Sequence, residues 1–262
     1  VHLREQASWK AWHRAIRQPE NTTLVVVGGV AVADVLSLVE TYFQRWPVPR
    51  AALPPYVKPV PEAARPNGEV ARIIPVANLD LSYVAAACRL AGPSRDVGTA
   101  VAASLVHKRM FASVRERWSA SYDPVVRTST ERATGTLLVA TASLPASEVQ
   151  SFVESFREAI ETSALSNSEV RRAAMVVANV ELLARRNVGS YLVALRSLAE
   201  NESPETWFSE RNAKLPMLDA VALTTTMASC GQGISYAAAG PPISLRYAFE
   251  AVNLAPTEVI AP

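Results

Sequence analysis

Residues that commonly bind metals or carry redox chemistry are scarce in this sequence. The 262 residues include only three histidines and two cysteines, His2, His13, His107, Cys88 and Cys230. No histidine has a second histidine at the spacing of a metal site, and the cysteines have no C-x-x-C spacing. Lys108 and Arg109 follow His107, and their positive charge would oppose the binding of a divalent ion. We therefore expect no metal site within this chain.

The two cysteines lie in different apolar segments. Cys88 is part of the run "SYVAAACRLAG", and Cys230 ends a helix-like segment in "MASCGQG". We expect two buried, unpaired thiols. A disulfide between them is the alternative, and it would indicate an oxidising compartment. The sequence leaves a bacterial-type cytoplasm and a periplasm equally open as the location.

The signatures of several other functions are absent. There is no G-x-S-x-G and no Walker loop, and the "GQG" at residues 231–233 precedes a predicted strand instead of following one. No run of about 18 apolar residues is present that could span a membrane. The 26 basic residues nearly balance the 24 acidic ones. Such a balance does not favour nucleic acid or an acidic membrane surface as the partner.

The first third of the chain contains a predicted helix, strand and helix, followed by a proline-rich segment. Apolar residues recur at helical spacing before Pro19, Thr22 to Val27 predict a buried strand, and residues 32–46 predict an amphipathic helix. Residues 47–66 then hold seven prolines in twenty positions. Because proline removes backbone donors and fixes φ, we expect an extended linker there.

The remaining residues predict a mixture of strands and helices. Strands are expected around residues 70–74 and from about 79, in an antiparallel pair at 122–130 and 135–144, and at 233–240. Helices are expected at 93–118, 147–161, 166–186, 189–200, 204–213, 217–228 and 241–253. This order predicts an α+β fold.

One pattern occurs twice. "TLVVVGGVAVADVLSLVETYF" and "ISYAAAGPPISLRYAFEAVNL" each read as a buried strand, a glycine stop, a short turn and an amphipathic helix, and they lie 211 residues apart. That distance is too long for a solenoid repeat and fits two large homologous domains. We therefore predict that residues 1–46 end a first domain, that 47–66 form a linker, and that 67–262 form a complete second domain.

Two segments resemble the pitrilysin or insulinase family of zinc metallopeptidases, the inverzincins. The first segment resembles the family's end-of-domain signature at Pro19, Asn21, Leu24 to Gly28, Tyr42, Phe43, Trp46 and Pro47. The second resembles a helix end of the family's second domain at Arg109, Met110, Phe111, Val114, Arg115, Glu116 and Tyr122. The resemblance implies a two-layer metallopeptidase-like domain, with a mostly antiparallel sheet covered by helices. It also implies that the last helix, strand and helix of a homologous domain precede it.

The family's zinc motif is missing. Its members bind zinc through H-x-x-E-H on a helix and a distant glutamate, and none of the three histidines here belongs to such a motif. The resemblance implies that the ligands lie in a domain upstream of the segment that begins near Pro19. We expect this chain to hold no zinc cofactor, no metal ligands and no catalytic residues of its own, and to be inactive in isolation.

The resemblance assigns a substrate-binding role to Arg115 and Tyr122. In the family, an arginine and a tyrosine at this spacing face the zinc site and hydrogen-bond the substrate backbone. A fixed guanidinium and a phenol can stabilise the negative charge that develops on the scissile carbonyl oxygen. Spacing alone favours a structural role, in which Arg115 offsets the dipole at a helix end and Tyr122 opens a strand. Ser119 and Ala120 stand where the family usually has Gly-Leu, and a serine makes a left-handed turn costlier.

Two functions follow from these observations. In the first, the chain is the C-terminal region of a zinc peptidase, which positions a peptide and closes the chamber while an upstream domain or partner subunit supplies zinc. In the second, it is a non-catalytic structural or assembly module with the same fold. The expected partners are a homologous zinc-binding domain or subunit and a peptide substrate, with a homo- or heterodimer possible.

Overall fold

The computed structural model describes most of the chain. It covers residues 22–46, 68–91, 96–119, 124–131, 135–200 and 207–259, and the single positions Trp9, His13, Arg17, Pro19 and Ser121. Tyr122, the predicted linker 47–66 and most of the helix predicted before Pro19 lie outside the described residues. The chain divides into two compact units, residues 1–59 with 181–207 and residues 60–180 with 208–262.

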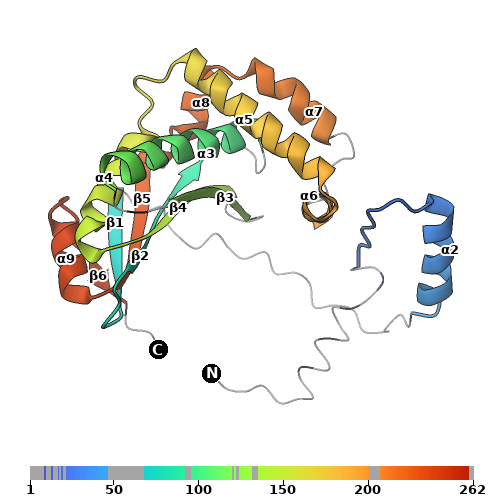
Figure 1. The fold of residues 1–262 in the computed structure, drawn as a ribbon, viewed down its shortest axis with the longest axis horizontal. Coiled ribbons are helices and arrows are strands. Elements are labelled where there is room, and N and C mark those ends of the chain that lie inside the picture. The colour runs from blue at the N-terminus through green and yellow to red at the C-terminus, as the bar shows by residue number, and fades with distance from the viewer. Residues whose placement is uncertain are drawn as a thin grey trace. The chain divides into compact units, whose positions relative to one another are not determined.

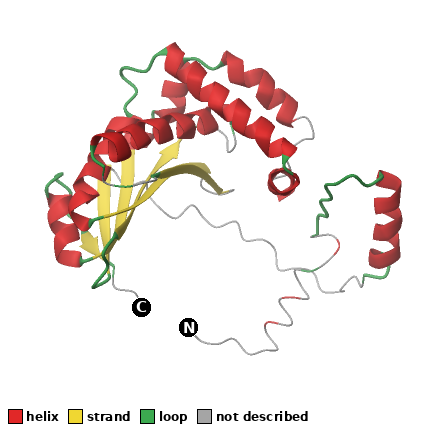
Figure 2. Cartoon of the chain, viewed as in Figure 1, coloured by secondary structure: helices red, strands yellow, loops and turns green. Residues whose placement is uncertain are grey.

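The larger unit is built on one six-stranded sheet (Figures 1 and 2). Its strands are β1 Gly68–Pro75, β2 Ser82–Leu90, β3 Val125–Glu131, β4 Gly135–Leu144, β5 Gly233–Gly240 and β6 Thr257–Glu258. They lie in the order β3-β4-β2-β5-β1-β6. β1 runs parallel to β5 and β6, and the other neighbours are antiparallel. The predicted α+β fold with a mostly antiparallel sheet is therefore confirmed.

The described α-helices are divided between the two units, with α2 and α6 in the smaller one. They are α2 Val32–Phe43, α3 Val97–Met110, α4 Val149–Ile160, α5 Asn167–Arg186, α6 Val188–Glu200, α7 Trp207–Lys214, α8 Ala220–Met227 and α9 Pro242–Glu250. A π-helix, η2 Phe111–Arg117, continues α3, and short 3-10 turns lie at Ala146–Glu148, Leu215–Met217 and Cys230–Gln232. Asp96 begins α3, because its carboxylate accepts a hydrogen bond from the Val97 N–H at 2.7 Å.

Among the described residues, helices cover one face of the sheet. Along β2, Ser82, Val84, Ala86, Cys88 and Leu90 are buried, whereas the residues between them are exposed or half-buried. This period-two pattern places alternate side chains on opposite faces. α3 and α4 cover the buried face, as Figure 1 shows.

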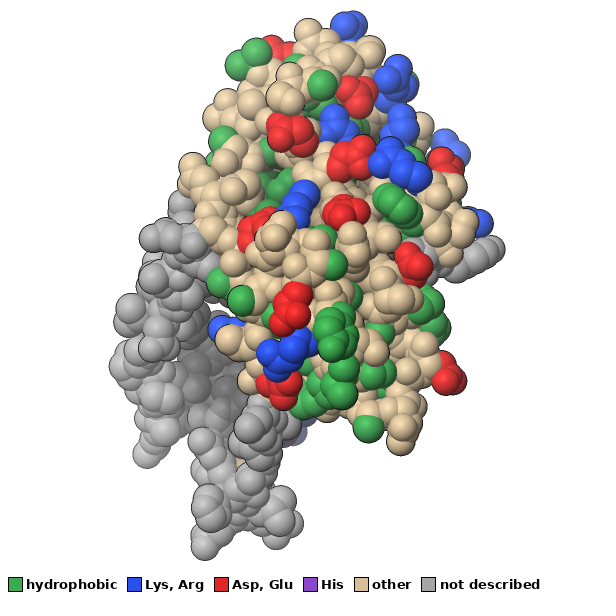
Figure 3. Space-filling model, turned by 90° about the vertical axis from the view of Figure 1, so that its left-hand side faces the viewer, with side chains coloured by type: hydrophobic (Ala, Val, Ile, Leu, Met, Phe, Trp, Pro, Cys, Tyr) green, Lys and Arg blue, Asp and Glu red, His purple; other side chains and the backbone are tan. Residues whose placement is uncertain are grey.

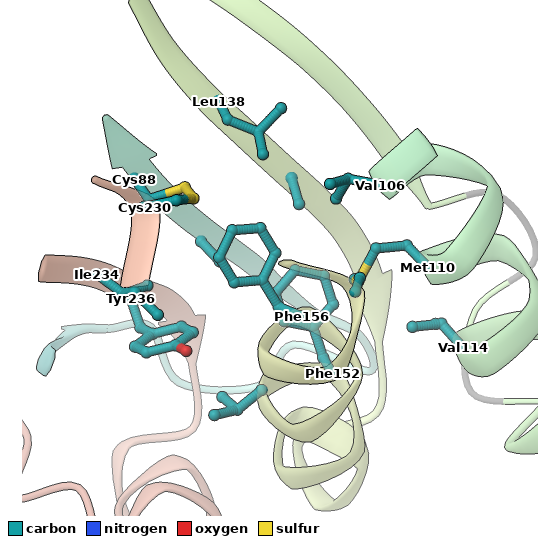
Figure 4. Close-up of a cluster of buried hydrophobic side chains, with 14 of the residues drawn as sticks. Cys88, Val106, Met110, Val114, Leu138, Phe152, Phe156, Cys230, Ile234 and Tyr236 are labelled. Atoms are coloured by element: carbon teal, nitrogen blue, oxygen red, sulfur yellow. A yellow bond between two sulfur atoms is a disulfide. The ribbon is translucent and has the colours of Figure 1, made fainter. Parts of the chain in front are cut away.

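The core lies between the sheet and these helices (Figure 4). Phe152 and Phe156 of α4 are fully buried, as are Met110 of α3 and Leu138 of β4. The Phe156 ring meets the ring of Tyr236 edge-on, with 6.2 Å between the centroids. Offset and edge-to-face arrangements suit the quadrupoles of aromatic rings.

A disulfide joins Cys88 of β2 to Cys230, which precedes β5 (Figure 4). Both residues are buried, as the sequence predicted, but the preferred interpretation of two unpaired thiols is wrong. Cys88 and Cys230 are 142 residues apart, so composition could not reveal that β2 and β5 are hydrogen-bonded neighbours. Their Cα atoms lie 4.9 Å apart, within the range that a disulfide bridges.

The smaller unit contains the first strand-and-helix segment. α2 forms as predicted, but Thr22 to Val27 are not a strand in the structure, and the prediction of a buried strand is wrong. Leu24 and Val26 are 55% and 49% exposed. A strand is defined by hydrogen bonds to a neighbouring strand, and within the described residues no other segment pairs with this one.

The surface over the helices mixes charges of both signs. On the face that Figure 3 shows, acidic and basic side chains are interspersed among polar and apolar ones. No helix among the described residues has the length and apolar character needed to cross a membrane.

Candidate functional site

Arg115 lies on the π-helix that ends α3. The amide of Trp118 donates to the carbonyl of Ser113, five residues earlier, at 3.0 Å. Single π turns are rare and are frequently found at functional sites, because they re-aim the side chains that follow. The sequence predicted a helix through this segment but could not predict its change of pitch.

The π-helix is held by its inner face. Ser113 and Val114 are buried, and the hydroxyl groups of Ser113 and Ser155 lie 2.7 Å apart, which ties the segment to α4. Arg115 is half-buried, and its guanidinium carbon lies 4.8 Å from the centre of the Phe111 ring. A cation over an aromatic face is attracted by the ring quadrupole. The side chain of Arg115 is therefore oriented before any ligand arrives.

Ser119 ends this segment in the left-handed conformation. Its φ is 52°, the region that normally favours glycine. The chain therefore adopts the left-handed geometry with a serine, in spite of the cost that the sequence indicated. Since Tyr122 lies outside the described residues, Arg115 is the member of the predicted pair whose place is known.

The described histidines and carboxylates do not gather into a cluster. Within the described part of the chain, no group of three or more His, Cys, Asp or Glu residues is arranged to hold a metal ion. His107 is half-buried on α3, with its ring 6.2 Å from that of Phe111. His13 is exposed, and His2 is outside the described residues.

Arg109, another residue of the matched segment, stabilises the end of α4. Its guanidinium donates to the carbonyls of Ala159 at 3.2 Å and Glu161 at 2.6 Å, and it lies 3.4 Å from a carboxylate oxygen of Glu169. These carbonyls are at a helix C-terminus, where a cation is favourable. Arg109 therefore connects α3, α4 and α5, and sequence spacing alone did not indicate this role.

A second polar cluster joins α4 to the sheet. Arg157 of α4 donates to both carboxylate oxygens of Glu69 and to the carbonyl of Val252, the last at 3.1 Å. The phenol of Tyr236 donates to Glu69 at 3.2 Å. Burial, together with the negative charge of Glu69, raises the pKa of the Tyr236 phenol well above its ordinary value.

This cluster predicts a loss of stability at alkaline pH. The folded state keeps the Tyr236 proton above the ordinary pKa of about 10, whereas the unfolded state releases it. Unfolding then releases a proton, so the free energy of unfolding should fall as pH rises above 10, by up to about 1.4 kcal/mol per pH unit. Tyr236→Phe should remove this slope in denaturant titrations between pH 9 and 11.5. Tyr247→Phe, at an exposed position of α9, should keep it; equal slopes in both variants would contradict the assignment.

Comparisons with known proteins point to one family. The model of the peptidase M16 inactive domain matches residues 6–176, more than half of the chain. A peptidase M16 inactive domain from Pseudomonas fluorescens superposes with a TM-score of 0.73 at 14% identity, covering 92% of this chain and 58% of that one. A protease from Helicobacter pylori gives 0.74 at 12% identity, covering 91% and 60%. A search of curated proteins finds no match.

Other solved structures share the fold more distantly. The first half of the periplasmic protease PqqL from Escherichia coli has a TM-score of 0.63 at 14% identity, covering 97% of this chain and 61% of that one. A chain of Complex III2 from Candida albicans has 0.65 at 14% identity, covering 88% and 57%. This chain thus spans about three fifths of the length of the structures named here.

Proposed function

Because the chain belongs to the peptidase M16 inactive-domain family, we propose that it is the C-terminal, non-zinc-binding region of a pitrilysin- or insulinase-like metallopeptidase. In this proposal it closes the peptide chamber and positions the peptide. A homologous domain upstream or a partner subunit supplies the zinc site. The observation that carries the proposal is the match of the inactive-domain model to a sequence without H-x-x-E-H.

Arg115 is the proposed substrate-binding residue, with Tyr122 as its second donor. An arginine stays charged at any working pH and offers several N–H donors. The π-helix and the Phe111 ring hold Arg115 in place, and a donor that needs no reorganisation is the more effective one for a developing oxyanion. In this role Arg115 hydrogen-bonds the peptide, and the zinc is held by residues outside this chain.

Arg115→Ala should lower the turnover of the complete peptidase roughly 100-fold, the effect of removing one oxyanion donor. The expected readout is the rate of cleavage of a quenched fluorescent peptide, with the zinc content measured in parallel and unchanged. Arg117→Ala is the matched control, because Arg117 lies on the same π-helix and pairs with exposed Glu158 at 2.8 Å. Cleavage at the normal rate by Arg115→Ala would refute the proposed role.

Residues 22–43 are proposed to end a first domain, in which residues 22–27 would pair as a strand that they do not form among the described residues. In the second copy of this pattern, β5 lies between β1 and β2, and α9 buries its fourth, seventh and eighth residues, Leu245, Ala248 and Phe249. The same positions of α2 are Val35, Leu38 and Val39. They line an apolar hollow of about 470 Å³ with Leu24 and Val26.

The glycines of the two copies support this proposal. A Cβ at Gly240 would collide with the Ser82 side chain of the neighbouring strand, so Gly240 allows β5 and β2 to approach. A Cβ at Gly28 would meet nothing closer than Val30 at 3.9 Å. Gly28 therefore has no packing role among the described residues, and a neighbouring strand from another sheet would provide one.

Exposed apolar side chains are consistent with further partners. Met175, Val176 and Val180 of α5 are each more than half exposed, as are Val32 and Tyr42 of α2. Contiguous apolar surface usually marks an interaction site. We propose a homologous zinc-binding domain or subunit as the partner.

The alternative proposal is a structural or assembly module. The similarity to a chain of Complex III2 favours it, because that fold there belongs to a multi-subunit complex. Reconstitution with the zinc-binding partner separates the two functions. A stable complex that binds zinc and cleaves no peptide would support the module, whereas cleavage that depends on Arg115 would support the peptidase.

A further inference from the structure

The sheet has a second face that the described helices α3 and α4 do not cover. On this face the neighbouring residues form rows across the strands: Ser143, Tyr83, Ala239 and Ile74 in one row, and Val125, Thr141, Ala85, Ala237 and Arg72 in the next. Tyr83 is 62% exposed, and Ile74 and Val125 are each 43% exposed. The face is therefore accessible over the width of five strands.

The middle of this face is hollowed. Ala85, Ala237 and Ala239 form a floor of small side chains, with the larger Ile74, Tyr83 and Val125 around it. The hollow has a volume of about 370 Å³. Because these neighbouring positions are all alanine, there is room above the sheet for the side chains of another molecule. An exposed apolar depression of this kind is typical of a binding surface.

The charged side chains that the structure describes on this face are all arginines. Among the side chains that the structure describes, the strands contribute Arg72 from β1, Arg89 from β2 and Arg127 from β3, and no carboxylate. None of the three has an ion-pair partner among the described residues. The helical face in Figure 3 mixes both signs, so the open face differs from it in charge.

We propose that the open face of the sheet docks an acidic amphipathic helix of a partner polypeptide. The strands under the hollow already have hydrogen-bonded neighbours on both sides, so an added strand could not join them and a helix can lie across them. Its apolar stripe fills the hollow between Tyr83, Ile74 and Val125. Its carboxylates meet the arginines at the rim, where charge complementarity selects an acidic partner over a basic one.

The spacing of the arginines sets the length of the partner. Arg72 on β1 and Arg127 on β3 lie four strands apart. Arg127 is in the row next to the one that contains Arg72. At about 4.8 Å per strand this is roughly 20 Å. A helix rises 1.5 Å per residue with 3.6 residues per turn, so two carboxylates about 14 residues apart lie on the same side of the helix and would reach both arginines. This docking surface requires neither the zinc site nor the role of Arg115.

The proposal is tested with two synthetic helical peptides of 20 residues. Both carry the same Leu and Ala stripe; one has Glu at positions 4 and 18, and the other has Lys there. Fluorescence anisotropy with the 262-residue chain should show that the Glu peptide binds at least tenfold more tightly. Its affinity should fall as NaCl is raised from 50 to 300 mM, because salt screens exposed charges.

Variants of the face provide the second arm of the test. Arg72→Glu with Arg127→Glu should weaken binding of the Glu peptide at least tenfold and strengthen that of the Lys peptide. Ala237→Phe, which fills the hollow, should weaken both. Arg171→Glu with Arg172→Glu, at exposed positions of α5, is the charge-matched control and should leave both affinities unchanged. Circular dichroism verifies that each variant is folded.

Three results would overturn the proposal. Equal affinity for the two peptides would show that charge does not select the partner. Equal losses in the α5 control would show that net charge, and not this face, determines binding. Self-association of the wild-type chain that disappears in Arg72→Glu with Arg127→Glu, measured by sedimentation, would show that a second copy occupies the face.

Discussion

Removing the disulfide between Cys88 and Cys230 should lower the free energy of unfolding by about 5 kcal/mol. The two residues are 142 positions apart, and closing so long a loop removes much of the conformational entropy of the unfolded chain. Both sulfurs are buried in the core that α4 packs against, so the native state holds the bond without exposing it. Guanidinium titrations of wild type and Cys88→Ala with Cys230→Ala would measure the difference.

The single variants make this test specific. Cys88→Ala and Cys230→Ala each break the same bond, so each should lose nearly as much stability as the double variant. A reductant present during unfolding should lower the wild-type midpoint and leave the double variant unchanged. Additive losses in the single variants, with no effect of reductant on wild type, would mean that the thiols are unpaired in solution.

The amides of Leu24 to Val27 should exchange with deuterium at least about 1,000-fold more slowly in the complete protein than in the isolated 262-residue chain. In the isolated chain these residues form no strand, and the side chains of Leu24 and Val26 are exposed. If the proposed first domain accepts them as β1 and β2 accept β5, they become part of a core sheet. Opening of a core strand costs up to the full stability of the domain, which is commonly 5 kcal/mol or more.

β5 serves as the internal reference for this measurement. Its residues Tyr236 to Ala239 are hydrogen-bonded on both sides and should be protected in both samples. Leu24→Asp should abolish the gain in protection at residues 22–27, whereas Asp34→Asn, at an exposed position near the start of α2, should not. Rapid exchange of Leu24 to Val27 in the complete protein would contradict the proposed domain boundary.

The sequence predicted elements whose periodicity is local and missed those set by distant contacts. β4 and β5 begin and end where glycine stops and alternation placed them, at Gly135–Leu144 and Gly233–Gly240. The strand predicted at Thr22 to Val27 failed because a strand also needs a neighbour, which its own residues cannot specify. The prediction of unpaired thiols at Cys88 and Cys230 failed for the same reason, since the disulfide depends on how β2 and β5 lie side by side.

The candidate site was found through a resemblance and not through spacing. Arg115 stood out because of the segment around it, yet nothing in that segment predicted the π-helix that orients its side chain. By local propensity alone, the serine at position 119 makes a left-handed turn costlier. Its φ of 52° shows that the surrounding structure outweighed a preference of roughly 1–2 kcal/mol.

The position of β5 determines when the sheet can be completed during synthesis of the chain. β5 separates β1 from β2 in the sheet, although it follows both by more than 140 residues. During synthesis on the ribosome, β1 and β2 therefore emerge long before β5, the strand that lies between them in the sheet. At synthesis rates of about 5–20 residues per second, this interval lasts on the order of ten seconds. We expect the nascent chain to need protection by chaperones during that interval, and to become protease-resistant only after residue 240 leaves the exit tunnel.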